Sequence, residues 1–341
     1  MLKGSATTEG TAVYRAAQGT RTADGHFREW RGLSLSSLGI GTYLGPDDDA
    51  TDALYEAAVE RAIGSGINVV DSAINYRGQR SERAVGRALG RLVGGGGVAR
   101  EAVVVATKGG FLPFDGPAPP GLLRSGDLVA GTHCMTPRYL EDQIERSRVN
   151  LGVETIDIYY LHNPEQQLDA LARPNFLTVV RDAFAALEEQ VRRGVIRIYG
   201  CATWNGFRVP PDSRNHLSLE ELVSIARDIA GTDHHFRVIQ LPINLAMTES
   251  VRLPTQQIGH DRVPLLVAAS RLGISVVGSA TLMQSQLTRA LPKQLHSAFP
   301  GFKTDARRAI AFSQSLPVAA ALVGMKSVSH LEENLAPPRV S

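Results

Sequence analysis

The sequence predicts a single (β/α)8 barrel, and three observations lead to this fold class. Short apolar, β-branched runs recur eight times along the chain, and each is followed by a segment with helical spacing of apolar residues. The runs are apolar almost throughout, which is typical of parallel strands that are covered on both faces. The length of 341 residues is slightly above that usual for such a barrel. A two-domain α/β protein is the alternative, but no Pro-, Gly- or Ser-rich linker divides the chain.

The elements follow one another in a regular alternation. The first 26 residues are polar and are expected to form a mobile arm, and one barrel domain is expected to span residues 27–341. At its start, HFREWRGLSLS could form a short hairpin. The predicted barrel strands are 38–43, 67–72, 102–108, 156–162, 195–202, 237–243, 274–280 and 318–324. The predicted helices are 51–64, 80–92, 137–151, 176–193, 218–230, 261–272, 303–315 and 328–335.

Local signals support several of these boundaries. Asp48 precedes the first predicted helix. Ser218 precedes the fifth and stands three residues before Glu221, as in a capping box. The connection Gly109–Thr136 is too long for an ordinary barrel loop, so we expect it to be a functional loop over the barrel mouth.

Composition excludes several classes of protein. Apolar residues make up 43% of the chain and charged residues 21%, which argues against a disordered chain. A net charge of +2 without a basic block gives no support for nucleic-acid binding. No apolar run reaches the roughly 18 residues of a membrane span, and the N-terminus lacks the apolar stretch of a secretory signal, so we expect a cytoplasmic protein. Cys134 and Cys201 support neither a disulfide scaffold nor a zinc site, and no metal is predicted. Nothing in the sequence indicates an oligomeric state.

Four titratable side chains lie at or just after the ends of consecutive predicted strands. Asp71 ends the second strand, Tyr76 follows five positions later, Lys108 ends the third strand and His162 ends the fourth. Singly, Asp71 could cap a turn, Tyr76 could be a rim aromatic and His162 could be a core histidine. Because active sites of (β/α)8 barrels lie at the carboxyl ends of the strands, the four side chains can meet at one point. Only five of the 36 basic residues are lysines. A lysine at the end of an apolar strand in this chain therefore indicates a specific role and not a generic surface charge.

These motifs resemble the aldo-keto reductase family over roughly residues 32–336. The resemblance is carried by VVDSAINY (69–76), VVVATKGG (103–110), YYLHNP (159–164), GVIRIYGCATWN (194–205) and GMKSVSHLEENL (324–335). It implies that Asp71, Tyr76, Lys108 and His162 form the catalytic tetrad of the family. It also implies a nicotinamide dinucleotide cofactor, with NADPH favoured over NADH. The small-molecule substrate would be an aldehyde, ketone or sugar-like carbonyl, reduced reversibly to the alcohol.

Elementary physical chemistry is compatible with this tetrad. Tyr76 would give a proton to the carbonyl oxygen, but the pKa of a free tyrosine, near 10, is too high for ready release at neutral pH. A buried Lys108 ammonium at about 4 Å would favour the phenolate by on the order of 4 kcal/mol at an effective dielectric near 20. Asp71 would keep Lys108 charged, and His162 would orient the substrate oxygen through a hydrogen bond.

By the same resemblance, the nicotinamide contacts fall on the later strands. Gln240 matches the glutamine that binds the carboxamide. The usual Ser-Asn pair falls on Ala202 and Thr203, so only Thr203 can contribute a polar side chain. The usual stacking aromatic aligns with Gly278, and Trp204 is a candidate to replace it.

The other end of the cofactor is expected to be held by two later segments. Pyrophosphate-side candidates follow the seventh strand, and they are Ser279, Leu282 through its backbone, and Gln286. Candidates for the adenosine and its 2′-phosphate lie in the last motif, and they are Lys326, Ser327, His330, Glu333 and Asn334. Substrate walls are expected from 109–136, 204–215 and 245–261.

Two further interpretations of these residues remain open. Lys108 could be the Schiff-base nucleophile of an aldolase or lyase. The chain could also be a non-catalytic, cofactor-binding sensor or scaffold, as its resemblance to potassium-channel β subunits allows. The glycines at 39, 41 and 45 do not fit a dinucleotide-binding loop, because the third comes one position late. A short-chain dehydrogenase is disfavoured because no Tyr-x-x-x-Lys motif occurs.

Overall fold

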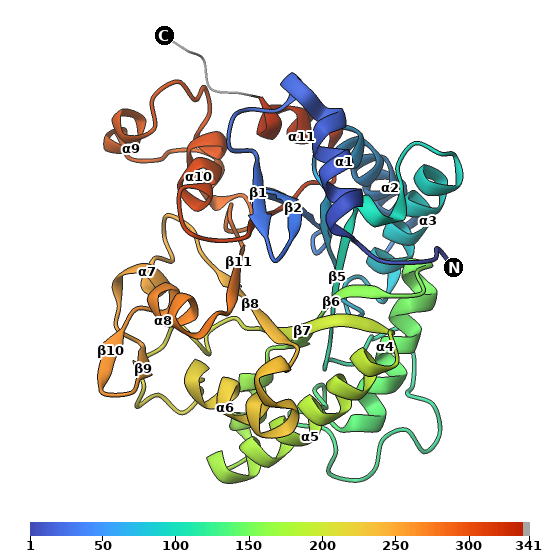
Figure 1. The fold of residues 1–341 in the computed structure, drawn as a ribbon, viewed down its shortest axis with the longest axis vertical. Helices are drawn as coiled ribbons and strands as arrows, with labels where there is room; N and C mark the ends of the chain where they lie inside the picture. Colours follow the sequence, from blue (N-terminus) through green and yellow to red (C-terminus); the bar gives the residue numbers. More distant parts are fainter. Residues whose placement is uncertain (337–341) are drawn as a thin grey trace.

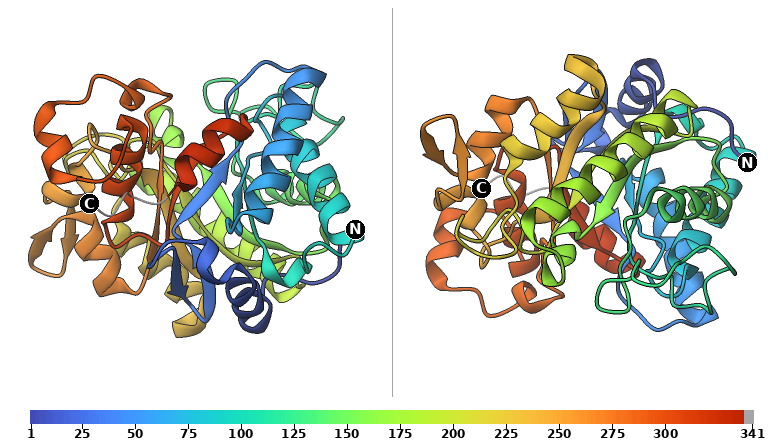
Figure 2. Two further views of the ribbon diagram at one scale, coloured as in Figure 1. Left: turned by 90° about the horizontal axis from the view of Figure 1, so that it is seen from above. Right: turned by 90° about the horizontal axis from the view of Figure 1, so that it is seen from below.

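The computed structural model describes residues 1–336 and confirms the predicted closed barrel (Figure 1). Eight parallel strands close on themselves, and the helices lie outside them (Figure 2). The barrel strands are β3 (Leu38–Gly41), β4 (Val69–Asp71), β5 (Val104–Gly109), β6 (Ile156–His162), β7 (Ile196–Ala202), β8 (Phe236–Pro242), β11 (Ser275–Ser279) and β12 (Ala320–Gly324). All eight runs predicted as strands therefore supply the barrel.

The predicted helices are present with small shifts at their ends. They are α2 (Asp49–Gly64), α3 (Arg80–Gly94), α4 (Pro137–Leu151), α5 (Arg173–Arg192), α6 (Leu219–Ala230), α8 (Leu265–Leu272), α10 (Asp305–Gln314) and α11 (Val328–Leu335). Two short helices are added, α7 (Glu249–Arg252) and α9 (Lys293–Ala298). Helix α8 starts later than predicted because β10 (Asp261–Val263) pairs antiparallel with β9 (Gln256–Ile258) in a small separate hairpin.

Side-chain caps explain where two of these helices begin. The Asp48 carboxylate accepts a hydrogen bond from the Thr51 N–H at 2.8 Å, ahead of α2. The Ser218 hydroxyl accepts one from the Glu221 N–H at 3.3 Å, ahead of α6. Each cap satisfies an N–H group that has no partner inside the helix.

The N-terminal segment differs from the unstructured arm expected from the sequence, because it contains helix α1 (Thr8–Gln18). Tyr14 on this helix is buried in the main hydrophobic core. The Ala6 N–H donates a hydrogen bond to the Asp157 carboxylate at 2.7 Å, which ties the segment to the start of β6. These contacts give the first residues fixed partners on the barrel.

The predicted hairpin is present as β1 (Phe27–Trp30) and β2 (Leu33–Ser36). Leu33 and Leu35 are buried together with inward-facing barrel residues such as Val104. Asn68, just before β4, donates a hydrogen bond to the Ser34 carbonyl at 2.9 Å. The hairpin therefore closes the barrel at the amino ends of its strands, and the opposite end is left for a site.

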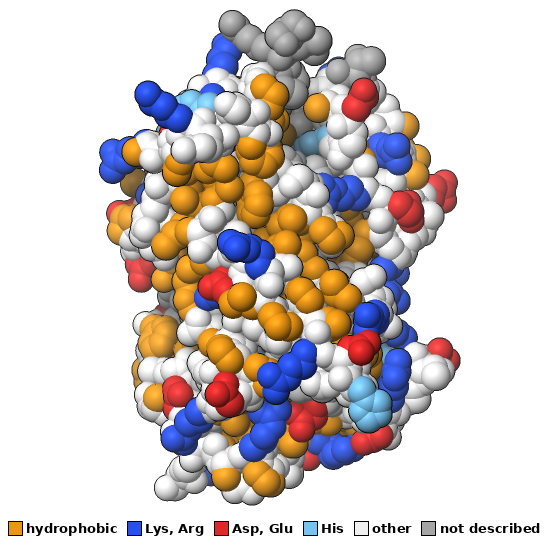
Figure 3. All heavy atoms as spheres, turned by 90° about the vertical axis from the view of Figure 1, so that its left-hand side faces the viewer, with side chains coloured by type: hydrophobic (Ala, Val, Ile, Leu, Met, Phe, Trp, Pro, Cys, Tyr) orange, Lys and Arg blue, Asp and Glu red, His pale blue; other side chains and the backbone are white. Residues whose placement is uncertain are grey.

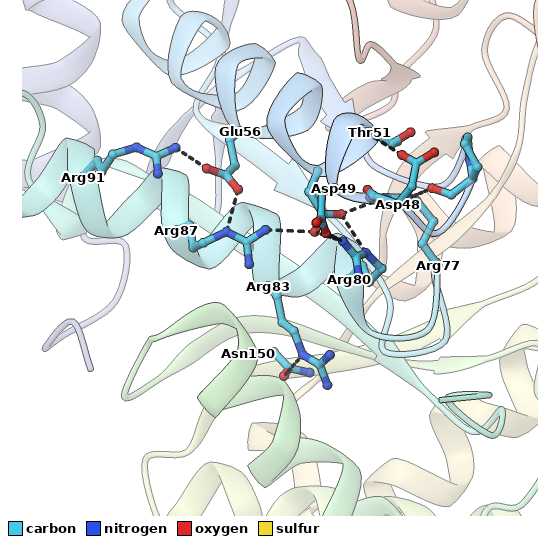
Figure 4. Close-up of polar contacts among 12 residues, drawn as sticks. Asp48, Asp49, Thr51, Glu56, Arg77, Arg80, Arg83, Arg87, Arg91 and Asn150 are labelled. Atoms are coloured by element: carbon cyan, nitrogen blue, oxygen red, sulfur yellow. Dashed lines mark hydrogen bonds and ion pairs between the residues drawn. The ribbon is translucent and has the colours of Figure 1, made fainter. Parts of the chain in front are cut away.

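A ladder of arginine–carboxylate pairs joins α2 to α3 and to the segment before α3 (Figure 4). Its members are Asp52 and Glu56 on one side and Arg77, Arg80, Arg87 and Arg91 on the other. Arg77 is buried and also donates to the Pro46 carbonyl at 2.8 Å. Because Arg77 follows Tyr76 directly, these contacts help to fix the backbone beside that tyrosine.

The surface shows no large area of a single charge on the face in Figure 3. There, Lys and Arg side chains are mixed with Asp and Glu, and hydrophobic side chains gather in the middle. Within residues 1–336, none of the helices combines the length and the apolarity needed to cross a membrane.

Candidate active site

The carboxyl ends of β4, β5 and β6 bring Asp71, Lys108 and His162 to the open end of the barrel. The Lys108 Nζ lies 2.5 Å from Asp71 Oδ1 and donates a second hydrogen bond to the Ser72 carbonyl at 2.7 Å. The lysine is 1% exposed, so its charge is paired inside the protein. Its Nζ also lies 4.9 Å from the centroid of the Tyr76 ring. The structure thus places the ammonium between the carboxylate and the phenol ring.

Tyr76 and His162 face a pocket of about 450 Å³ at this end of the barrel. Their rings meet edge to face with centroids 5.7 Å apart. Tyr43 packs on the Tyr76 ring at 4.9 Å, and Phe111 packs on the His162 ring at 5.1 Å. Trp204 lines the pocket as well and is 43% exposed. Asp71, Tyr76 and His162 therefore line one cavity with aromatic walls, and Lys108 lies beside Asp71 and Tyr76 without lining it.

The charges of the site follow from burial and from the lysine. Burial raises the pKa of Tyr76, and the Lys108 ammonium opposes this rise. Burial would lower the pKa of Lys108, but the Asp71 carboxylate and the Tyr76 phenol outweigh it, so the pKa of Lys108 is raised and the ammonium persists. Burial and then the Lys108 charge hold the pKa of His162 well below its usual value. At neutral pH the site contains a neutral phenol, a neutral imidazole and one lysine–aspartate ion pair.

The two residues expected to contact the nicotinamide, and two of those expected on the pyrophosphate side, line this pocket. Thr203, Gln240, Ser279 and Leu282 are all among its lining residues. Gln240 Nε2 donates to Asp71 Oδ2 at 2.8 Å, so the second oxygen of that carboxylate is also bound. Four residues that line the pocket each carry a buried polar atom without a hydrogen-bond partner in the described chain, namely Asn75 Oδ1, His162 Nδ1, Thr203 Oγ1 and Thr281 Oγ1. Because these atoms are not exposed to the pocket, a ligand would bind them only after a rotation of the side chain.

The loop after β11 has an unusual backbone where it borders the pocket. Met283, Gln284 and Ser285 have φ values of 45°, 52° and 70°, in the left-handed region that non-glycine residues rarely adopt. In the described part of the chain, the N–H groups of Gln284 and Ser285 make no hydrogen bond. Successive free N–H groups in such a turn form a concavity that suits an anion.

The remaining cofactor candidates lie outside the pocket lining. Gln286 begins a short 3-10 turn just beyond Ser285. Lys326 reaches toward the β3–α2 connection, since its Nζ would be 3.3 Å from a Cβ placed on Gly45. Ser327 bonds to Ser329, while His330 is exposed and Glu333 is half-buried.

Asn334 is not brought to this group. It is buried, and it lines a separate hollow of about 320 Å³ with His26 and Ser37, near the amino ends of the strands. Its backbone carbonyl accepts a hydrogen bond from Arg307, which caps the end of α11. An adenine contact by the Asn334 side chain therefore has no support from its position.

Two buried residues of the site were not expected from the sequence. Glu165 Oε1 accepts hydrogen bonds from the N–H groups of Trp204, Asn205 and Gly206 at 2.8, 3.0 and 3.2 Å, and so holds the loop that carries Trp204. His133, in the long connection 109–136, contacts the His162 carbonyl at 2.7 Å. The motif YYLHNP ends one residue before Glu165, so an acidic residue after an apolar strand was the available signal. For His133 there was none.

Fold and site together define a (β/α)8-barrel protein with a pocket and a cluster of titratable side chains at the carboxyl ends of its strands. The model of the Aldo/keto reductase family matches residues 37–209, half of the chain. The chain belongs to this family, which confirms the resemblance seen in its motifs. The family supports nicotinamide-dependent oxidation and reduction of carbonyl and alcohol groups as the general activity.

Curated relatives include several sugar and carbonyl oxidoreductases. The chain is 26% identical over 329 residues to L-galactose dehydrogenase from Arabidopsis thaliana, covering 89% of this chain and 85% of that enzyme. It is 30% identical over 222 residues to NADH-specific methylglyoxal reductase from Escherichia coli (strain K12), covering 62% of this chain and 60% of that enzyme. A D-threo-aldose 1-dehydrogenase from a Pseudomonas species is 30% identical over half of each chain.

Solved structures agree with the fold at lower sequence identity. The thermostable aldo-keto reductase Tm1743, in complex with the inhibitor epalrestat, superposes with a TM-score of 0.64 at 19% identity, covering 91% of this chain and 92% of that one. An aldo/keto reductase from Klebsiella pneumoniae, in complex with NADP and acetate, gives a TM-score of 0.59 at 19% identity, covering 89% and 86%.

Proposed function

We propose that this protein is an NAD(P)H-dependent carbonyl reductase in which Tyr76 donates the proton, and that the reaction is reversible. The observation that carries the proposal is the Asp71–Lys108 ion pair, buried against the ring of Tyr76 at the wall of the pocket. A buried cation next to a phenol eases proton loss from that phenol, which is the task of a general acid.

The protein side of the reaction divides among four residues. Tyr76 gives its proton to the carbonyl oxygen, and the Lys108 ammonium stabilises the phenolate that remains. Asp71 keeps Lys108 charged and in place, and its own second oxygen is held by Gln240. The neutral ring of His162 donates a hydrogen bond to the same substrate oxygen and orients it. In the oxidative direction, the Tyr76 phenolate accepts the proton of the alcohol.

The residues at the pocket also fit a nicotinamide dinucleotide. When bound, the reduced nicotinamide supplies the hydride to the carbonyl carbon. Thr203 lines the pocket and its hydroxyl has no hydrogen-bond partner in the described chain, so after a rotation of its side chain it would hold the nicotinamide end. The free N–H groups of the loop after β11 would hold the pyrophosphate. We favour NADPH over NADH because Lys326 lies over the β3–α2 connection, where it could meet a 2′-phosphate.

For the substrate we propose an aldehyde, ketone or sugar-like carbonyl. The aromatic rings of Tyr43, Phe111 and Trp204 would cover apolar faces of such a molecule, and Asn75, which also lines the pocket, would bind a hydroxyl group through its side-chain amide. The named activities of the relatives on sugars and on methylglyoxal are in keeping with this class.

A Schiff-base reaction at Lys108 is disfavoured by the geometry. A nucleophilic lysine must reach the substrate and be neutral. Lys108 is 1% exposed and is absent from the pocket lining, and its pKa is raised by Asp71. We therefore retain the reductase and not the aldolase or lyase.

Two measurements test the proposal. Purified protein is mixed with NADPH or NADH and with methylglyoxal, para-nitrobenzaldehyde and several aldoses, and cofactor oxidation is followed. Tyr76→Phe should lower kcat by at least about 100-fold, because general acid catalysis contributes about 10²- to 10⁴-fold, while NADPH binding persists. Turnover that survives in Tyr76→Phe would refute the role of Tyr76. NADPH binding without turnover of any carbonyl would instead favour the sensor or scaffold.

Cofactor choice is tested separately at Lys326. Lys326→Met should weaken NADPH binding by about 10-fold, the size of one charge-assisted contact, and leave NADH binding unchanged. Lys293→Met, in α9 and away from the pocket lining, is the matched control. Equal loss of both cofactors would contradict a 2′-phosphate contact.

A further inference from the structure

We propose that His133 is a positioning residue. It binds the backbone carbonyl of His162, and this contact places the His162 ring correctly for the substrate oxygen. The inference rests on the proposed function, because it concerns the placement of one of its residues. His133 lies near the end of the connection 109–136 and is fully buried. It does not line the pocket and would act only through its neighbours.

The hydrogen bonds of His133 define which ring nitrogen carries the proton. Gln167, in the 3-10 turn Pro164–Asp169, places its Nε2 2.7 Å from His133 Nδ1 and 3.3 Å from the His133 carbonyl. A carbonyl only accepts, so the amide group of Gln167 faces His133 with its nitrogen, which only donates. His133 Nδ1 must therefore be the acceptor, and the proton sits on Nε2.

The proton on His133 Nε2 points at the backbone carbonyl of His162, which is a lining residue of the pocket. His133 Nε2 lies 2.7 Å from the backbone carbonyl of His162 and donates to it. The carbonyl belongs to the last residue of β6, beyond which the chain turns through Asn163 with φ of 48°. The Asn163 N–H of the same peptide donates to the Ala202 carbonyl at 2.6 Å, so the bond from His133 holds this peptide from its other side and restrains the backbone next to the His162 ring.

Packing joins the same residue to the wall of the pocket. The Phe111 ring meets the His133 ring at 4.8 Å and the His162 ring at 5.1 Å, edge to face in both cases. The Gly110 carbonyl accepts a hydrogen bond from the Cys134 N–H at 2.8 Å, so both ends of the connection are fastened beside His133. A Cβ on Gly110 would stand 2.8 Å from His133 Nε2, which shows how closely the chain passes the ring.

Protonation is consistent with this arrangement. Burial lowers the pKa of His133 to about 4, so the ring is neutral at neutral pH and carries a single proton. A second proton on Nδ1 would face the amide nitrogen of Gln167 and lose that hydrogen bond. The neutral form is the one that can accept from Gln167 and donate to His162 at the same time.

The test compares His133→Phe, which keeps the ring but loses the donor, with His133→Gln, whose side-chain amide can restore it. With NADPH and methylglyoxal or para-nitrobenzaldehyde, His133→Phe should lower kcat by about 10- to 100-fold, the size of effect expected when a reacting group is displaced by up to about 1 Å. NADPH affinity should stay within about twofold, because the donor contacts no cofactor residue. His133→Gln should recover most of kcat. His235→Gln, which removes a half-exposed histidine paired with Glu188 away from the pocket, controls for loss of a histidine.

A second experiment distinguishes positioning of His162 from a general loss of stability, by measuring the effect of His133→Phe with and without the His162 side chain. In a His162→Gln background, adding His133→Phe should change kcat by less than about twofold, since the two residues act as one unit. The same fold loss in both backgrounds, or a loss of kcat that tracks the folded fraction in thermal melts, would overturn the proposal.

A final readout does not need turnover. Nitrogen-15 NMR of histidine-labelled protein should show His133 with its proton on Nε2, and His133→Phe should shift the His162 ring signals, while His133→Gln should restore them. If the wild type reduces no carbonyl but these NMR results hold, the proposed reaction fails and the placement of His162 by His133 stands. An Nδ1-protonated His133, or an unshifted His162, would overturn the placement itself.

Discussion

Replacing Lys108 by methionine should make Tyr76 a weaker acid and should lower the fraction of Tyr76 that is phenolate at a given pH. The ammonium lies 4.9 Å from the centroid of the Tyr76 ring. At about 5 Å and an effective dielectric near 20, its attraction to a phenolate is about 3 kcal/mol, or about 2 pKa units. Burial already raises the pKa of Tyr76, and without Lys108 nothing of comparable size would oppose it. At a fixed pH below that pKa, alcohol oxidation should therefore slow by about 100-fold.

The sign of the pH effect can be checked directly. In oxidation Tyr76 must be deprotonated, so kcat/KM rises with pH until the pKa of Tyr76 is passed. Loss of Lys108 should move this rise to higher pH. The assay is kcat/KM for NADP⁺-linked oxidation of the alcohol formed from whichever aldehyde is reduced, measured across pH. The fluorescence of NADPH shows whether each variant still binds the cofactor.

A double variant avoids leaving a buried, unpaired carboxylate in the site. Lys108→Met alone leaves the Asp71 carboxylate buried without its partner, which costs about 3–5 kcal/mol of stability. The double variant Asp71→Asn with Lys108→Met keeps the site neutral. In the double variant, the rise of kcat/KM for oxidation should also move to higher pH, but by less than in Lys108→Met alone. The direction is the same because Lys108 lowers the pKa of Tyr76 by more than Asp71 raises it. A folded, cofactor-binding double variant with an unchanged pH profile would refute the role given to the ammonium.

Three predictions concern stability. Arg100→Met leaves the buried Asp157 without a cation, so urea unfolding should show a loss of about 3–5 kcal/mol, and a loss under about 1 would contradict the pairing. Arg77→Met should cost less, about 1–3 kcal/mol, because Asp52 keeps two other arginines; a cost equal to that of Arg100→Met would show that the ladder does not share charge. The pKa of His133 is depressed, so its contribution is present above about pH 6.5 and is lost as pH falls toward about 4. His133→Gln should therefore flatten the stability profile in that window, and an identical profile would be evidence against a buried neutral His133.

The barrel was predictable because its signals are local. Eight apolar runs coincide with eight strands, since a parallel strand covered on both faces must be apolar along its length. The capping residues Asp48 and Ser218 stand where their helices begin, because a cap acts within three residues of its own position. The clustering of Asp71, Tyr76, Lys108 and His162 was predictable from the barrel, since strand ends meet at one rim, while their catalytic roles stay predictions.

What was missed depends on contacts distant in sequence. Helix α1 gave no signal because Tyr14 is its one large buried apolar residue, and its anchors lie elsewhere in the chain. His133 and Gln167 are 34 residues apart, and only the path of the long connection brings them together. Asn334 matched a family motif, and in the structure it lines a separate hollow with His26 and Ser37, so its adenine contact stays a prediction. A motif gives the order of the residues, whereas the direction in which the side chains of a terminal helix point depends on how that helix packs.

The left-handed run at Met283–Ser285 has a consequence for how ligands would be exchanged. Glycines there would remove strain, but they would also let the free loop sample many more shapes. Side chains at these positions narrow that sampling, so less conformational entropy is lost when an anion settles against the loop. If this loop binds an anion, as we propose, its backbone strain is present before binding and the loop needs little rearrangement when the anion binds. Ser285→Gly should therefore reduce affinity for a dinucleotide even though it relieves the backbone strain at this position.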